Sequence, residues 1–160
     1  MKEKEFLSHI NENTRLIWKL LHLYFHEEDA KKDMFQEIVL QCWAGRNNFR
    51  GDAKVSTWIY KVALFTILAL QRKSAKHQHA ALAEADEKHL VTEGEARADQ
   101  SEALYRCIQS LKEVDKTIIT MHLDGFSNPE IAEFLGISIN NLNVKLYRVK
   151  ESLKKQLTNE

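Results

Sequence analysis

Apolar residues recur every three or four positions through most of the 160-residue chain, a spacing that places them on one side of an α-helix. In the N-terminal half this pattern predicts three helices, over about residues 4–25, 29–44 and 56–73. The first is expected to bend near residues 11–13, and Asp29 is expected to cap the second. A polar loop, GRNNFRGDAKV, separates the second and third helices.

A second helical block begins near Ser101, after a segment of different character. Residues 77–100 are rich in Ala and Glu and poor in large apolar side chains, so they predict a flexible linker. Helices are then expected over about residues 101–111 and 115–123. Strand signals are weak throughout. The predicted fold is therefore all-α, with two small helical domains at 1–76 and 101–160.

The stretch FSNPEIAEFLGISINNLNVKLYR, residues 126–148, is typical of a helix-turn-helix. Ser127 and Glu130 have capping-box spacing, and Pro129 stands in the first turn, where its missing N–H costs little. Gly136 can end the first helix in the left-handed conformation, and Ser138 can cap the second. The second helix has one apolar stripe, which predicts a buried side made by Leu142, Leu146, Val149 and Leu153.

The formal net charge of zero hides an uneven distribution of charged residues along the chain. Residues 43–76 contain seven basic side chains and one acidic, and residues 138–157 contain five basic and one acidic. Residues 77–102 contain seven acidic and two basic. Two basic segments separated by an acidic one favour a protein that touches nucleic acid at two places.

Other classes of function have little support. No Ser-His-Asp set, phosphate-binding loop, dinucleotide-binding glycine pattern or metal constellation is present, so we expect no enzyme activity, no cofactor and no metal. The two cysteines, Cys42 and Cys107, are expected to be free buried thiols. We see no signal peptide, and the longest apolar run, residues 62–70, is too short to span a bilayer. A cytoplasmic protein without membrane insertion is expected.

The segments DAKKDMFQEIVLQCW and FRGDAKVSTWIYKVA resemble region two of extracytoplasmic-function sigma factors, and the helix-turn-helix block resembles their region four. The resemblance implies an alternative sigma factor that binds core RNA polymerase, directs it to a promoter and helps to melt the DNA. It also implies an anti-sigma protein as a partner. The chain departs from many relatives at Leu64, Phe65 and Ala69, where polar residues are frequent, and at Asn143, where Lys is frequent.

The resemblance also assigns three sets of site residues. The contact to core polymerase falls on Asp29, Asp33, Gln36 and Glu37, of which the last three share a helix side. The minus-ten promoter element is expected to meet the loop and the next helix, through Phe49, Arg50, Lys54, Trp58, Tyr60 and Lys61. At Trp58 a core position is an equally good interpretation. The minus-thirty-five element is expected to meet Ser138, Asn140, Asn141, Asn143, Lys145, Tyr147 and Arg148.

Two alternatives remain open at this point. The helix-turn-helix also resembles the output domain of response regulators, which bind duplex DNA as dimers without polymerase. The acidic helix and the FRGDA loop argue against that class. The apolar stretch at residues 64–70 keeps open a degenerate sigma-like protein that acts only through protein interactions.

Overall fold

In the computed structural model, residues 1–79 and 100–158 are described, without the side chains of residues 75–79 and 100. All regular structure in these parts is helical, as the sequence predicts. The chain divides into two compact units, Met1–Asp86 and Glu87–Glu160. Most of the predicted linker, residues 80–99, lies outside the described part. None of the described helices combines the length and apolar character needed to cross a bilayer.

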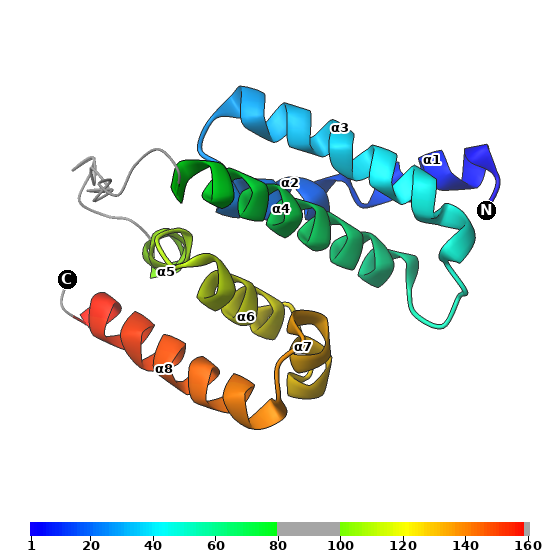
Figure 1. Ribbon diagram of the computed structural model, residues 1–160. Coiled ribbons are helices and arrows are strands. Elements are labelled where there is room, and N and C mark those ends of the chain that lie inside the picture. Colours follow the sequence, from blue (N-terminus) through cyan, green and yellow to red (C-terminus); the bar gives the residue numbers. More distant parts are fainter. Residues whose placement is uncertain (80–99, 159–160) are drawn as a thin grey trace. The chain divides into compact units, whose positions relative to one another are not determined.

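The first unit packs helices α2, α3 and α4 against one another, with α1 joined to α2 (Figure 1). Its core is formed by apolar side chains that are almost completely buried, among them Ile17, Leu20, Leu21, Ile38, Ile59, Ala63 and Ile67. The side chain of Gln71 donates a hydrogen bond to the backbone oxygen of Tyr24 (3.2 Å), which ties α4 to the end of α2. The elements are α1 (Glu3–Glu12), α2 (Thr14–Tyr24), α3 (Glu28–Gly45), the short 3₁₀ helix η1 (Arg46–Asn48) and α4 (Val55–His79).

The predicted bend in the first helix is confirmed as a break at Asn13. The side-chain amide of Asn13 donates to the backbone oxygen of His9 (2.7 Å), and the Thr14 hydroxyl donates to that of Ile10 (2.9 Å). Both carbonyls also accept from the backbone N–H of Asn13, so these side-chain bonds reinforce the end of α1. The predicted cap of the next helix is wrong, since α3 begins at Glu28 with Glu27 at the cap position. Asp29 instead lies in the first turn, where a carboxylate interacts favourably with the helix dipole.

The second unit is built around α8, which packs against α5, α6 and α7 (Figure 1). The predicted stripe of Leu142, Leu146, Val149 and Leu153 is buried, as are Ile118, Met121 and Ile131 of the neighbouring helices. The elements are α5 (Gln100–Gln109), α6 (Glu113–Leu123), α7 (Asn128–Leu135) and α8 (Ile139–Thr158).

The local signals of the helix-turn-helix are confirmed one by one. The Ser127 hydroxyl accepts a hydrogen bond from the backbone N–H of Glu130 (3.3 Å), and the Glu130 carboxylate accepts one from that of Ser127 (2.8 Å). Gly136 ends α7 with a positive φ of 69°, where a side chain would be strained. The Ser138 hydroxyl accepts from the backbone N–H of Asn141 (3.1 Å) and so caps α8. The turn between α7 and α8 is therefore fixed by short-range chemistry.

The buried thiol of Cys42 allows a first prediction. Burial raises its pKa to about 12, so almost no reactive thiolate exists at pH 8. We expect iodoacetamide at pH 8 to leave Cys42 unmodified in the folded protein and to modify it readily in denaturant, as peptide mass spectrometry would report. Cys107 is half-buried and should react first. Rapid labelling of Cys42 under native conditions would mean that the α3 packing described above is wrong.

Candidate functional site

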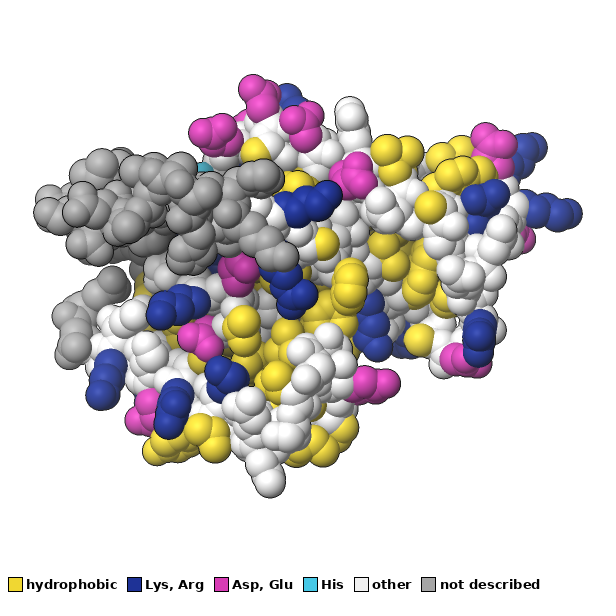
Figure 2. Space-filling view, viewed as in Figure 1, with side chains coloured by type: hydrophobic (Ala, Val, Ile, Leu, Met, Phe, Trp, Pro, Cys, Tyr) yellow, Lys and Arg dark blue, Asp and Glu magenta, His cyan; other side chains and the backbone are white. Residues whose placement is uncertain are grey.

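One side of α3 carries a row of exposed polar and acidic side chains. Asp29, Asp33, Gln36 and Glu37 are all exposed, and at 100° per residue they share one face of the helix. The opposite face holds Met34, Ile38 and Cys42 in the core. In Figure 2, acidic side chains gather along this helix. We call the set of Asp29, Asp33, Gln36, Glu37 and Leu40 the acidic face.

Leu40 is a member of the acidic face that sequence reasoning missed. It lies three and four residues after Glu37 and Gln36, and its side chain is 60% exposed. An apolar group beside carboxylates gives a surface both charge and a buried anchor when a partner binds. The signal was present in the helical spacing, because Leu40 falls one turn beyond Gln36.

The charges near the start of α3 are not equivalent. Lys31 Nζ donates to Glu28 Oε1 at 3.1 Å, and this hydrogen bond and the lysine charge lower the pKa of Glu28. The Glu37 carboxylate accepts a hydrogen bond from the Gln41 side chain (2.9 Å), which holds it without neutralising its charge. The acidic face thus keeps negative charge for a basic partner.

The loop between α3 and α4 and the first turns of α4 bring aromatic and basic groups together. The rings of Phe49 and Trp58 lie with centroids 5.6 Å apart, and both side chains are half-buried. Gly45 lies next to the Trp58 ring, because a β-carbon at Gly45 would stand 3.6 Å from the nearest ring atom. Arg50 and Lys54 are exposed on the same loop, and Lys61 is half-exposed on α4. Trp58 therefore packs against the loop and also leaves part of its ring at the surface.

Tyr60 has to be removed from the predicted DNA-contacting set. Its side chain is only 2% exposed, and it packs in the core of the first unit beside Ile59 and Leu64. Its residue type suggested base contacts, but the helical register turns it inward. Phe49, also in the predicted minus-ten set, is half-buried against Trp58.

The outward side of α8 carries most of the residues predicted for duplex recognition. Asn140, Asn141, Tyr147 and Arg148 are exposed, and Tyr147 is 67% exposed. Val144 lies among them, opposite the buried stripe. Lys145 is half-buried because the register places it at the flank of this side. An exposed polar helix of this size, beginning at a fixed turn, fits a DNA major groove.

Asn143 has a structural partner that its sequence position could not reveal. The Asn128 side-chain amide donates a hydrogen bond to the Asn143 side-chain oxygen at 3.0 Å. This bond joins the start of α7 to the second turn of α8. It leaves the amide N–H groups of Asn143 for another acceptor.

Two segments of the chain, one from each unit, match family models. Residues 9–77 match the model of Sigma-70 region 2, and residues 101–153 match the model of Sigma-70, region 4. The chain belongs to the sigma-70 family. The acidic face, the aromatic loop and the start of α4 lie in its region 2, and the helix-turn-helix lies in its region 4.

Relatives and solved structures agree with the family. The chain is 27% identical over 139 residues to RNA polymerase sigma factor YlaC of Bacillus subtilis, covering 83% of this chain and 80% of the relative. It is 25% identical over 134 residues to the ECF RNA polymerase sigma-E factor of Escherichia coli, covering 76% of this chain and 70% of the relative. The fold matches that of the sigma factor RpoE from Bartonella quintana, solved with the anti-sigma factor NepR, with a TM-score of 0.71 at 16% identity over 97% and 98% of the chains. The expected extracytoplasmic-function type is confirmed.

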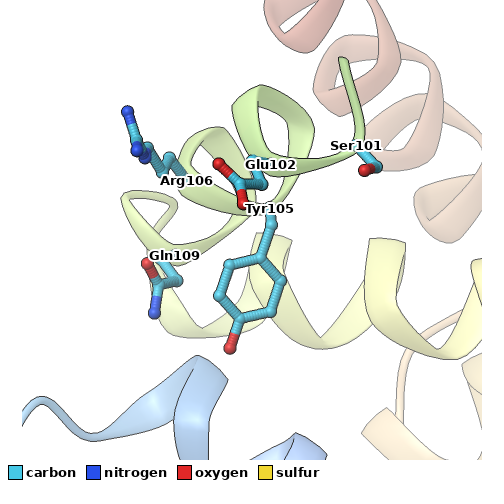
Figure 3. Close-up of a pocket in the computed structure, with 5 residues that line it drawn as sticks. All are labelled: Ser101, Glu102, Tyr105, Arg106 and Gln109. Carbon is cyan, nitrogen blue, oxygen red and sulfur yellow. The ribbon is translucent and has the colours of Figure 1, made fainter. Parts of the chain in front are cut away.

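A hollow lies beside α5 in region 4. Figure 3 shows five described residues that line it, and all five belong to this helix: Ser101, Glu102, Tyr105, Arg106 and Gln109. Burial raises the pKa of the Tyr105 hydroxyl.

Proposed function

We propose that this sigma-70 family member is an alternative sigma factor that acts by binding, with no catalytic site of its own. It binds core RNA polymerase in the cytoplasm, directs it to promoters and helps to open the DNA. The observation that supports this most strongly is the pairing of two surfaces in one chain. An acidic, partly apolar face lies on region 2, and an exposed polar helix lies on region 4.

The acidic face is the proposed contact to core polymerase. Asp29, Asp33 and Glu37 project from one side of α3 and favour a basic partner surface. Leu40 supplies an apolar group that the partner can bury. A regulator that acts on DNA alone does not need such a face. Binding to core polymerase therefore distinguishes a sigma factor from that class of regulator.

The proposed minus-ten contact is the aromatic and basic surface of the loop and α4. Phe49 and Trp58 offer ring faces, and Arg50, Lys54 and Lys61 offer positive charge. Unpaired bases stack on aromatic side chains, while cations attract the phosphate backbone. The basic excess of residues 43–76 fits this role.

The proposed minus-thirty-five contact is the first half of α8 in the major groove. The side chains of Asn140 and Asn141 can pair with adenine edges, and Arg148 with guanine or phosphate. The Ser138 hydroxyl caps the helix and can also donate to a phosphate. Tyr147 and Val144 can pack on sugar or thymine methyl groups.

An anti-sigma protein is a further proposed partner. The support is the fold shared with RpoE, which was solved with the anti-sigma factor NepR. We expect such a protein to cover the basic and acidic surfaces described above and to hold the sigma factor inactive.

Base contacts and phosphate contacts on α8 should respond differently to mutation, which tests the proposal. Asn141→Ala removes an exposed side chain but keeps the backbone bond to Ser138, so the helix stays capped. We expect a loss of about 1–3 kcal/mol at one or two promoter positions and relaxed specificity there. Lys145→Ala should weaken binding to all promoter sequences alike. It should also reduce the slope of log affinity against log salt concentration by about one unit.

The measurement is a promoter-library profile of holoenzyme carrying each variant. Lys154→Ala, an exposed lysine far along α8, is the matched control and should behave as the unmodified chain. The assignment of faces on α8 is wrong if Asn141→Ala leaves the profile unchanged while Lys145→Ala alters base preference.

A further inference from the structure

A hydrogen bond between two asparagine side chains joins the two helices of the helix-turn-helix. The side-chain amide of Asn128, at the start of α7, donates to the side-chain oxygen of Asn143 on α8 at 3.0 Å. The two helices pack against each other (Figure 1), and the bond between them is exposed to solvent. Asn128 is half-buried and Asn143 is exposed. The bond therefore sets the direction of a side chain on the surface of α8.

Asn143 lies on the side of α8 that is proposed to enter the major groove. At about 100° per residue, it falls within about 60° of both Asn140 and Tyr147, which are exposed members of that side. Lys145 falls on the opposite flank of the helix. The amide of Asn143 can therefore meet the edge of a base while its oxygen is held by Asn128.

We propose that Asn143 reads a keto base, guanine or thymine, at one position of the minus-thirty-five element, and that Asn128 is the positioning residue that sets this preference. The inference rests on the proposed sigma function and names the class of base that α8 selects at that position. An unrestrained asparagine offers a donor and an acceptor side by side, which suits N6 and N7 of adenine. Asn143 has its oxygen turned toward Asn128 and two N–H groups left, so it presents donors.

The pattern of donors and acceptors in the major groove decides which bases suit such a side chain. Guanine presents O6 and N7, and thymine presents O4, all of which are acceptors. Adenine N6 and cytosine N4 are donors, and they would place a donor against the N–H groups of Asn143. Pairing with adenine through both amide atoms would also break the bond to Asn128 in a groove from which water is displaced. Asn143 therefore discriminates against adenine, the base that asparagine otherwise reads.

The turn itself does not depend on this bond. The Ser127 hydroxyl and the Glu130 carboxylate cap α7, and the Ser138 hydroxyl caps α8. None of these bonds uses the side chain of Asn128. A substitution there therefore changes the direction of one side chain on α8 and leaves both caps in place.

The test is a promoter-library profile of holoenzyme, with every position of the minus-thirty-five element randomised. With the unmodified chain, one position should favour guanine or thymine over adenine or cytosine by about fivefold to tenfold, the size of one hydrogen bond. Asn143→Ala should bring that ratio to within about twofold of unity and so identify the position. Asn128→Ala leaves the amide of Asn143 able to turn. It should admit adenine at the same position, while the other positions keep their preferences.

Asn128→Asp makes the sharper comparison. A carboxylate accepts hydrogen bonds and does not donate them, so Asn143 must donate to it and turn its own oxygen outward. The preference at that position should reverse to adenine or cytosine, with weaker binding to all sequences because of the added negative charge. A carboxylate in the first turn of α7 interacts favourably with the helix dipole, so the fold is kept, as circular dichroism would check. Glu133→Ala removes another exposed side chain from α7 and is the control, with an unchanged ratio.

The profiles separate the outcomes. Equal weakening at all sequences by Asn128→Ala, with the keto preference intact, overturns the positioning role, as does an unreversed preference in Asn128→Asp. A preference of the unmodified chain for adenine at the position identified by Asn143→Ala overturns the assigned direction of the bond. If Asn143→Ala alters no position while holoenzyme still selects a minus-thirty-five element, this inference alone fails. If the unmodified holoenzyme selects no such element, the proposed sigma function fails, and this inference fails with it.

Discussion

Reversing the charge of Asp33 and Glu37 to lysine should abolish co-purification with core RNA polymerase. Both carboxylates are exposed on the acidic face of α3, and the double substitution replaces two negative charges with two positive ones. Against a basic partner surface, like charges cost several kcal/mol, which is enough to lower affinity by about two orders of magnitude or more. The fold should be unaffected, because both side chains point away from Ile38 and Cys42.

A matched control is available on α1. Glu3 and Glu12 are exposed acidic residues of the same unit, and reversing both makes the same change in net charge. This control should co-purify with core polymerase as the unmodified chain does. Gel filtration of each variant with core polymerase reports the complex directly. Retained binding by the Asp33 and Glu37 variant would show that the acidic face is only a solvated surface.

Leu146→Ala should strongly destabilise the second unit while leaving the stability of the first unchanged. Leu146 is 6% exposed in the stripe that packs α8 against its neighbours, and truncating a buried leucine costs about 2–5 kcal/mol. A small domain has only about 5–15 kcal/mol of stability in total. Val144→Ala is the control, because Val144 is 49% exposed on the opposite side of α8 and should change stability by less than about 0.5 kcal/mol.

The tryptophans make this prediction easy to measure. All three, Trp18, Trp43 and Trp58, lie in the first unit, so their fluorescence reports that unit alone. We expect Leu146→Ala to lower the helical circular dichroism signal and the urea midpoint measured by circular dichroism. The urea midpoint measured by tryptophan fluorescence should not change. Equal midpoints for Leu146→Ala and Val144→Ala would contradict the buried stripe.

The features that sequence predicted best are set by chemistry within a few residues. The caps at Ser127 and Ser138 and the left-handed Gly136 depend only on neighbours in the chain, and all three are confirmed. The buried stripe of α8 follows from the same periodicity. The cap at Asp29 failed because three acidic residues in a row, 27–29, offer nearly equal starting points for a helix.

Features that depend on register or on distant contacts were harder to predict. Tyr60 was assigned by residue type, and only its place beside Ile59 and Leu64 on α4 shows that it is buried. The bond between Asn128 and Asn143 joins residues fifteen positions apart, and nothing local signals it. Phe65 sat within an apolar run whose inner and outer members become distinct only when the helix is packed.

Transcription by reconstituted holoenzyme tests whether the chain acts as a sigma factor. The full chain is added to core RNA polymerase with a library of promoter sequences, and the start sites are read by sequencing the transcripts. We predict that start sites appear only when both chain and core are present, and that they lie downstream of two shared sequence elements at fixed spacing. Start sites that do not depend on the chain, or binding of the chain to duplex DNA without any effect of core polymerase, would contradict the assignment as a sigma factor.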